Sequence, residues 1–145
     1  MTWLAVVAAV LLRRWYLVVR VRGGSMEPSL RDGDLVLARR RGGREPRRGD
    51  IVVLRRPPAA SPPPGTVLVH SGPVAAAPSR WLVKRVAAVA GDPVPAGVPA
   101  AVAGPVPEDM VVVLGDRPGL DSRLFGPAPI AAIHATVVRT IVTAR

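Results

Sequence analysis

The 145-residue sequence contains no cysteine, and its basic side chains include almost no lysine. The lack of cysteine excludes disulfides, thiol nucleophiles and thiolate metal sites. Only five residues are aromatic, so the core must be built from valine, leucine, isoleucine and alanine. Phosphate-binding loops of the forms G-x-x-x-x-G-K and G-x-G-x-x-G are also missing, so nothing in the sequence supports nucleotide binding.

Metal and acid–base candidates are sparse. His70 and His134 lie far apart in the sequence and lack the spacing of metal ligands, so we expect no metal site and no cofactor. Four carboxylates are better explained as turn formers and arginine partners than as catalytic acids. None of them has a neighbour that would clearly push the pKa values of two acids apart, as an acid–base pair requires. They are Asp32, Asp34, Asp50 and Asp116.

Lys84 is the single lysine beside nineteen arginines. An ammonium group can lose its proton when it is desolvated, whereas a guanidinium effectively cannot. Lys84 lies in an apolar, β-branched run, Trp81–Val89, which predicts a strand. Alternation puts Leu82, Lys84 and Val86 on one face and turns Arg85 towards solvent or a carboxylate. Burial on the apolar face would lower the pKa of Lys84, as a general base near neutral pH requires.

A candidate nucleophile, Ser25, follows two glycines. Gly23 and Gly24 suit a sharp turn that exposes the serine and lets a substrate backbone approach, although an ordinary turn has the same composition. A serine activated by a lysine is a known nucleophile–base pair. From the residues alone, Lys84 is either such a base or a solvated strand residue.

Four motifs, called boxes 1 to 4 here, resemble those of the type I signal peptidases and occur in that family's order. A single match of the form G-x-S-M-x-P is short, whereas the ordered set is specific. The boxes are Gly24–Leu30 with Asp32–Asp34 (box 1), Gly49–Val53 (box 2), Lys84–Val86 with Gly91–Asp92 (box 3), and Gly115–Asp116 with Asp121–Arg123 and Gly126 (box 4).

The resemblance implies a mainly β fold, with a compact signal-peptidase-like β-barrel or β-sandwich core and an N-terminal apolar anchor helix. It also implies a serine endopeptidase that cleaves signal peptides from exported preproteins after small residues (Ala-x-Ala type). Ser25 would be the nucleophile of an acyl-enzyme, its backbone N–H an oxyanion donor, and Lys84 the general base. The supporting residues would be Gly23, Gly24, Asp121, Ser122 and Arg123.

The substrate would bind in an extended form, as an added strand beside the nucleophile segment and the Lys84 strand. Its small side chains would enter shallow apolar pockets. The pocket candidates, each of which also suits a core position, are Val21, Met26, Leu82 and Val83.

The sequence departs from the family pattern at two positions. Many members carry a hydroxyl residue two positions before the nucleophile, where this chain has Gly23. Many also carry a serine near the lysine ammonium, where this chain has Gly119. Lys84 would then either lack one orienting hydrogen bond or receive it from Ser122 or a backbone carbonyl. Asp121 and Arg123 are expected to form a structural ion pair nearby.

The N-terminal segment contains an unbroken apolar run, Trp3–Leu12, followed by Arg13 and Arg14. Ten helical residues rise only about 15 Å, against ~30 Å of hydrocarbon, so spanning would need snorkelling and local thinning. A cleaved secretory signal fits less well, because the run lacks a basic n-region and a clear cleavage site.

The resemblance divides the chain into a membrane-anchor segment, residues 1–20, and a catalytic core, residues 21–145. Boxes 3 and 4 are close together, so the large inserted β-domain of longer relatives is expected to be absent. The family's active site implies a single-pass protein of the cell membrane with its core on the extracytoplasmic side. Arginines that follow the apolar run oppose this topology, and the sequence leaves the conflict open.

Further strands are expected at residues 17–21, 34–39, 51–55, 66–70 and 110–114. Residues 130–142 are expected to return as a helix or strand along the edge of the sheet. Residues 93–107, rich in proline, alanine and glycine, have little capacity for regular structure.

Parts of the sequence also suit other functions. The net charge of +10 and the cluster Arg39–Arg48 would suit nucleic acid, but no aromatic residue interleaves the cluster. We expect no nucleic-acid partner, and a solvated loop attracted to anionic lipid head groups instead. LexA-type repressors share the Ser–Lys pair but need an N-terminal helix-turn-helix. A nearer alternative is a maturation protease dedicated to one precursor, such as that of nickel superoxide dismutase.

Overall fold

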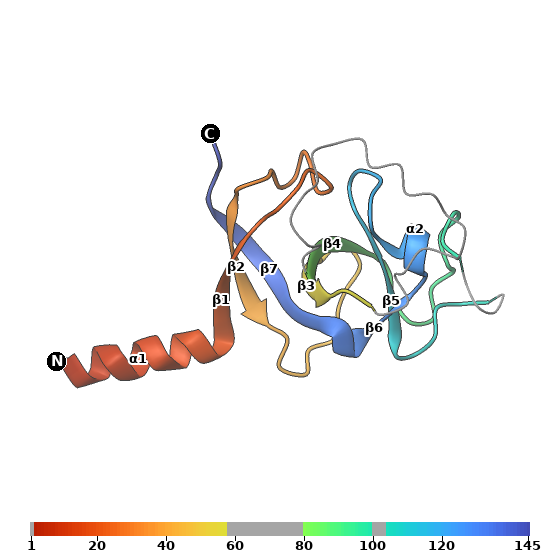
Figure 1. Ribbon diagram of the computed structural model, residues 1–145. Coiled ribbons are helices and arrows are strands. Elements are labelled where there is room, and N and C mark those ends of the chain that lie inside the picture. Colours follow the sequence, from red (N-terminus) through yellow and green to blue (C-terminus); the bar gives the residue numbers. More distant parts are fainter. Residues whose placement is uncertain (1, 58–79, 100–103) are drawn as a thin grey trace.

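The computed structural model describes residues 2–57, 80–99 and 104–145, and these form one antiparallel sheet of seven strands (Figure 1). The strand order is β1-β2-β7-β3-β4-β5-β6. In chain order the strands are β1 (Tyr16–Arg20), β2 (Leu35–Arg40), β3 (Ile51–Arg55), β4 (Trp81–Ala88), β5 (Met110–Leu114), β6 (Ala128–Pro129) and β7 (Ile133–Val142). The helices are α1 (Thr2–Trp15), α2 (Ser122–Phe125) and the 3-10 turn η1 (Ile130–Ala132).

The mainly β prediction is confirmed, but the sheet is not a closed barrel. Strands β1 and β6 lie at opposite ends of the strand order. Two predicted strands, residues 51–55 and 110–114, have the predicted bounds, and a third begins one residue later than expected, at Leu35. The strand predicted at residues 66–70 lies outside the described residues.

The C-terminal strand corrects one prediction. Residues 130–142 were expected along the edge of the sheet, yet β7 lies inside it, between β2 and β3. Small side chains make this position possible: Ala135 is fully buried and pairs with Val53, while Val137 pairs with Ala38. Alternation in the sequence predicts the strand, but it carries no information on which strands will be its neighbours.

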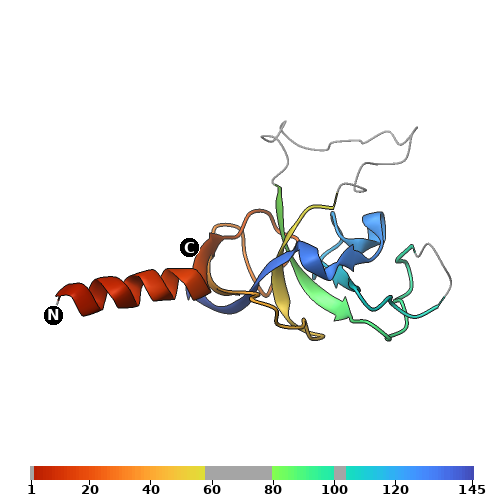
Figure 2. The ribbon, with the colours of Figure 1, turned by 90° about the horizontal axis from the view of Figure 1, so that it is seen from below.

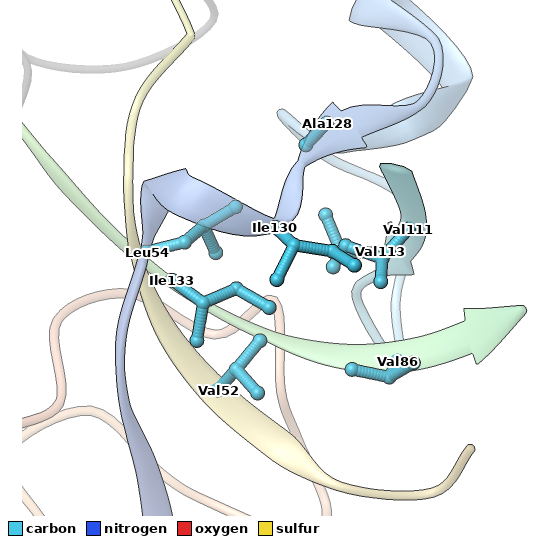
Figure 3. Packing of buried hydrophobic residues seen from close by; sticks show 8 residues of the cluster. All are labelled: Val52, Leu54, Val86, Val111, Val113, Ala128, Ile130 and Ile133. Carbon is cyan, nitrogen blue, oxygen red and sulfur yellow. The ribbon is translucent and has the colours of Figure 1, made fainter. Parts of the chain in front are cut away.

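Two apolar clusters hold the sheet on either side of β4. Figure 3 shows the first, in which Val86 of β4 packs with side chains from β3, β5 and β7. Its members are Val52, Leu54, Val86, Val111, Val113, Ala128, Ile130 and Ile133. The second cluster consists of Val21, Met26, Leu30 and Val36, and the half-buried Val83 packs against it. Strand β4 is therefore fixed from both faces, as a strand that positions a reactive side chain must be.

Helix α1 projects away from the sheet (Figures 1 and 2). None of its residues is buried. It leads directly into β1, which pairs with β2 from Tyr16↔Arg39 to Arg20↔Leu35, so residues 2–15 do not form a helix-turn-helix. The helical part of the expected anchor thus ends at Trp15. Within the described ranges, no helix has both the length and the apolar character needed to cross a membrane.

Candidate active site

Ser25 lies in the loop between β1 and β2, and the two ends of this loop are hydrogen-bonded to each other. The turn is held by backbone hydrogen bonds from Val21 N–H to Asp34 O (2.8 Å) and from Gly33 N–H to Val21 O (2.8 Å). Gly23 adopts φ 79°, a left-handed conformation that favours glycine, and its N–H donates to Asp32 Oδ1 at 2.7 Å. The sharp turn that the sequence predicted before Ser25 is therefore present.

The turn brings Ser25 against Lys84 of β4. Lys84 Nζ donates to Ser25 Oγ at 2.7 Å, although 59 positions separate the two residues in the sequence. Lys84 is only 3% exposed, on the same face as the buried Val86, as alternation predicts. The geometry joins the only lysine to the candidate nucleophile.

The environment of Lys84 lowers the pKa of its amine. Burial lowers the pKa of Lys84, and the nearby Arg123 guanidinium lowers it further, while the Asp121 carboxylate acts in the opposite direction. A neutral amine in hydrogen-bond contact with a hydroxyl can accept the proton of that hydroxyl. The contact between Lys84 Nζ and Ser25 Oγ is therefore compatible with a serine nucleophile activated by a lysine.

Box 4 forms a buried support for this site. Asp121 caps α2, because its Oδ1 accepts the N–H of Arg123 at 2.9 Å, and its Oδ2 accepts the N–H of Gly115, also at 2.9 Å. The expected ion pair is present, with Arg123 Nη2 3.4 Å from Asp121 Oδ2. Ser122 Oγ accepts the N–H of Val113 at 2.9 Å. Ser122 thus holds α2 to β5, and among the described residues Lys84 Nζ bonds only to Ser25.

The loop of box 4 lies directly against the serine turn. Arg117 N–H donates to Ser25 O at 2.9 Å. A Cβ atom on Gly115 would lie 2.6 Å from Arg117 O and 2.8 Å from Ser25 O, so only glycine fits there. A Cβ on Gly119 would lie 3.6 Å from Ser25 Cβ, an ordinary contact distance. Gly119 therefore adjoins the candidate nucleophile and has room for a small side chain.

A polar cluster joins all four boxes, and its full extent was not predicted from the sequence. Arg85 makes a two-pronged contact with Asp116, Nε to Oδ1 at 2.9 Å and Nη2 to Oδ2 at 3.0 Å. Arg85 Nη2 also donates to Ser29 Oγ (3.0 Å), and Nη1 donates to Gly49 O (3.2 Å). Ser29 Oγ donates in turn to Asp116 Oδ2 at 2.6 Å. We call these four residues the Arg85 clamp.

The charges of the Arg85 clamp reinforce one another. The hydrogen bonds from Arg85 hold the pKa of Asp116 below its ordinary value, and the Asp116 carboxylate raises the pKa of Arg85. The alternation of side chains along the strand predicted that Arg85 would point away from Lys84, towards solvent or a carboxylate, and Arg85 does contact a carboxylate. The parts played by Ser29 and Gly49 had no signal in the sequence beyond their membership of the boxes.

The pocket candidates fall into two groups. Val21 and Met26 are almost fully buried in the second apolar cluster, whereas Leu82 and Val83 are half-buried on β4. Only the second pair is placed where a bound chain could reach side-chain atoms without moving the core. Substrate contact itself stays a prediction for all four.

The other carboxylates are structural, as expected. Asp34 is buried and accepts the backbone N–H groups of Arg31 and Ala144, and these bonds lower its pKa. Asp50 accepts the N–H of Arg47. Within the described ranges, no three His, Asp or Glu side chains are grouped so that they could hold a metal ion.

A comparison with protein families agrees with this geometry. The family model described as "Signal peptidase, peptidase S26" matches residues 1–98, which include Ser25, Lys84 and boxes 1 to 3. Box 4 lies beyond the match, but the fold brings it to the same site. A search of curated proteins returned no match. Because the family match covers more than half of the chain, the chain belongs to the signal peptidase family, peptidase S26.

Proposed function

We propose that this protein is an endopeptidase that removes signal peptides after small residues, with Ser25 as nucleophile and Lys84 as general base. The observation that carries the proposal is the 2.7 Å contact between Lys84 Nζ and Ser25 Oγ, made by a lysine that is 3% exposed. An exposed lysine would stay protonated at neutral pH and could not act as a base.

The chemistry proceeds by acyl transfer. The neutral Lys84 amine accepts the proton of the Ser25 hydroxyl while Ser25 Oγ attacks the scissile carbonyl. Lys84 then gives this proton to the leaving amine, and later activates the water that hydrolyses the acyl-enzyme. The Ser25 N–H makes no hydrogen bond within the described part of the chain, so it is free to donate to the oxyanion.

The substrate would occupy the free edge of β4. Strand β4 pairs with β3 from Trp81 to Arg85, but its pairing with β5 begins only at Arg85. Backbone groups of Arg80 and Val86 bond towards the β3 side, so alternation turns those of Val83 to the open side. An extended peptide paired with Val83 would pass beside Lys84 and Ser25, where its carbonyl can be attacked.

Attachment to the cell membrane through α1, with the core on the extracytoplasmic side, belongs to the same proposal. Eight large apolar side chains of α1 are exposed, from Trp3 at 83% to Leu11 at 49%. A helix that is apolar on all sides is stable only when something apolar surrounds it. A protease dedicated to one precursor would use the same chemistry and would differ only in its substrate range.

The test is cleavage of a preprotein that bears an Ala-x-Ala site, by wild type, Ser25→Ala, Lys84→Ala and Lys84→Arg. We expect each variant to lose at least about 10³-fold in kcat/KM while its circular dichroism stays unchanged. An active Lys84→Arg variant would refute the base assignment, because arginine cannot accept the proton. Cleavage that needs one particular precursor, rather than any Ala-x-Ala site, would identify the dedicated protease.

A further inference from the structure

Helix α1 buries none of its side chains against the rest of the described chain. All of its residues, Thr2 to Trp15, are exposed. Isolated helices of this length are marginal in water, and exposed valines lower the helix propensity further. The exposed apolar side chains of α1 are therefore a candidate binding surface for an apolar partner.

Arginines gather at the C-terminal end of this helix, and the fold adds to those that the sequence places there. Arg40 Nε, from the end of β2, donates to Arg13 O at 3.4 Å. In the loop that follows, a Cβ atom on Gly42 would lie 3.9 Å from Trp15. The same loop folds over itself, with Arg41 Nε donating to Arg44 O at 3.2 Å. We call the resulting set the arginine collar: Arg13, Arg14, Arg40, Arg41 and Arg44.

Within the described part of the chain, the arginine collar has no acidic partner. The four ion pairs within the described residues use Arg48, Arg85, Arg117 and Arg123, none of which belongs to the collar. Glu45 is the single acidic residue in the cluster Arg39–Arg48. Five guanidinium groups around the base of an apolar helix therefore present uncompensated positive charge.

We propose that α1 and the arginine collar together bind the surface of a membrane that contains anionic phospholipid. The apolar side chains of α1 enter the acyl chains, and the collar arginines bind lipid phosphates, which guanidinium groups recognise with two parallel hydrogen bonds. This inference rests on the membrane attachment in the proposed function and goes beyond it by naming the lipid class and the residues that select it.

Two exposed tryptophan side chains lie close to the arginine collar. Trp15 is 53% exposed beside the arginine collar. Trp81 is 41% exposed, its ring centroid lies 5.0 Å from that of His134, and His134 Nε2 is 3.0 Å from Arg40 Nη1. Tryptophan is enriched at the head-group level of membranes, where one side of the ring is apolar and the other is wet. The combination of tryptophan and arginine in one region fits a lipid surface better than it fits nucleic acid. It also fits a lipid surface better than a second copy of this chain, because the second copy would bring a collar of the same charge.

The test is co-sedimentation of the full chain with vesicles of phosphatidylcholine alone, or of phosphatidylcholine with phosphatidylglycerol. The variant Arg14→Gln/Arg44→Gln removes two collar charges whose side chains have no hydrogen-bond or ion-pair partner within the described residues. The control Arg31→Gln/Arg145→Gln removes two exposed charges at the opposite end of β2, where Ala144 N–H bonds to Asp34.

We expect wild type to bind the anionic vesicles more tightly than the neutral ones, with an affinity that falls as salt rises. Each collar arginine should contribute about fivefold, so Arg14→Gln/Arg44→Gln should bind about 10- to 30-fold more weakly, and the control within about threefold of wild type. Equal binding to both vesicle types, equal losses in the two variants, or self-association without vesicle binding would overturn the inference. Cleavage of a short soluble peptide should be unchanged in both variants, which separates this outcome from failure of the protease proposal.

Discussion

Around Lys84, polar side chains are buried and each has a partner, whereas along α1 the apolar side chains are exposed. Lys84, Asp121 and Ser122 are each no more than 3% exposed, and no buried polar side-chain atom in the described residues lacks a hydrogen bond. Trp3 and Leu4 of α1 are more than three-quarters exposed. The two regions thus reverse the usual distribution of polar and apolar residues.

The reversal has a different cause in each region. A buried lysine is costly, and at this site the Lys84 amine has a hydrogen bond to Ser25 Oγ and the nearby carboxylate of Asp121, which caps α2, to offset that cost. An exposed apolar helix is costly in water, and only an apolar surrounding relieves that cost. The first region therefore supports the proposed catalytic site, and the second supports the proposed attachment to a membrane.

Breaking the close packing beside Ser25 should produce the largest effect. We expect Gly115→Ala to lower the free energy of unfolding by about 1–3 kcal/mol, because its Cβ would lie within 2.8 Å of two backbone carbonyl oxygens. The control Gly119→Ala, which meets only Ser25 Cβ at 3.6 Å, should change it by less than about 0.5 kcal/mol. Urea unfolding measures both; equal stabilities would show that the loop relaxes freely.

Loosening the Arg85 clamp should have a smaller effect. Asp116→Asn removes the charge that Arg85 grips with two nitrogens, and we expect a loss of about 1 kcal/mol in the free energy of unfolding, since the pair is partly exposed. Arg85→Lys should lose a similar amount, because an ammonium cannot make the two-pronged contact.

The pH dependence of that loss has a definite sign. The folded pKa of Asp116 is lowered, so its contribution is complete above the ordinary aspartate pKa and disappears as the pH falls through the lower folded value. Urea unfolding of wild type and Asp116→Asn should therefore differ at neutral pH and converge in strong acid. A constant difference down to about pH 2 would contradict the assignment.

Adding a hydroxyl at position 119, next to Ser25, should have the smallest effect. The type I signal peptidase pattern that this sequence resembles often has a serine where the chain has Gly119, and the structure leaves room for a small side chain there. We expect Gly119→Ser to raise kcat/KM by about 2- to 10-fold, the worth of one hydrogen bond to the amine. Gly119→Ala supplies the Cβ without the hydroxyl and should give no increase; a gain with alanine would assign the effect to packing.

The sequence predicted the parts of this molecule that depend on local patterns. The alternation of apolar residues predicted which face of the strand carries Lys84 and that Arg85 points the opposite way. The paired glycines predicted the turn at Gly23. The sequence did not predict which distant segments lie side by side, because long-range packing decides that. Nothing in residues 130–142 indicated that β7 would lie between β2 and β3, and nothing joined Ser29 to Asp116, 87 positions away.

The arginine-rich loop shows the same limit. Composition marked Arg39–Arg48 as a charged loop, but not that Arg40 would contact the last turn of α1. That contact depends on the register of β1 against β2, in which Tyr16 pairs with Arg39. One register brings the end of the helix and the end of the strand together, and the sequence does not specify it.

The central claim, a lowered pKa at the Lys84 amine, is open to direct measurement because the chain has a single lysine. Protein labelled with 13C at lysine Cε gives one lysine resonance, whose shift with pH reports the pKa of Lys84 without any assignment. We predict a midpoint below the ordinary lysine value of about 10.4, restored to that value in denaturant, and a rise in kcat/KM over the same pH range as the folded midpoint. A folded-state midpoint at or above the ordinary value would contradict the account.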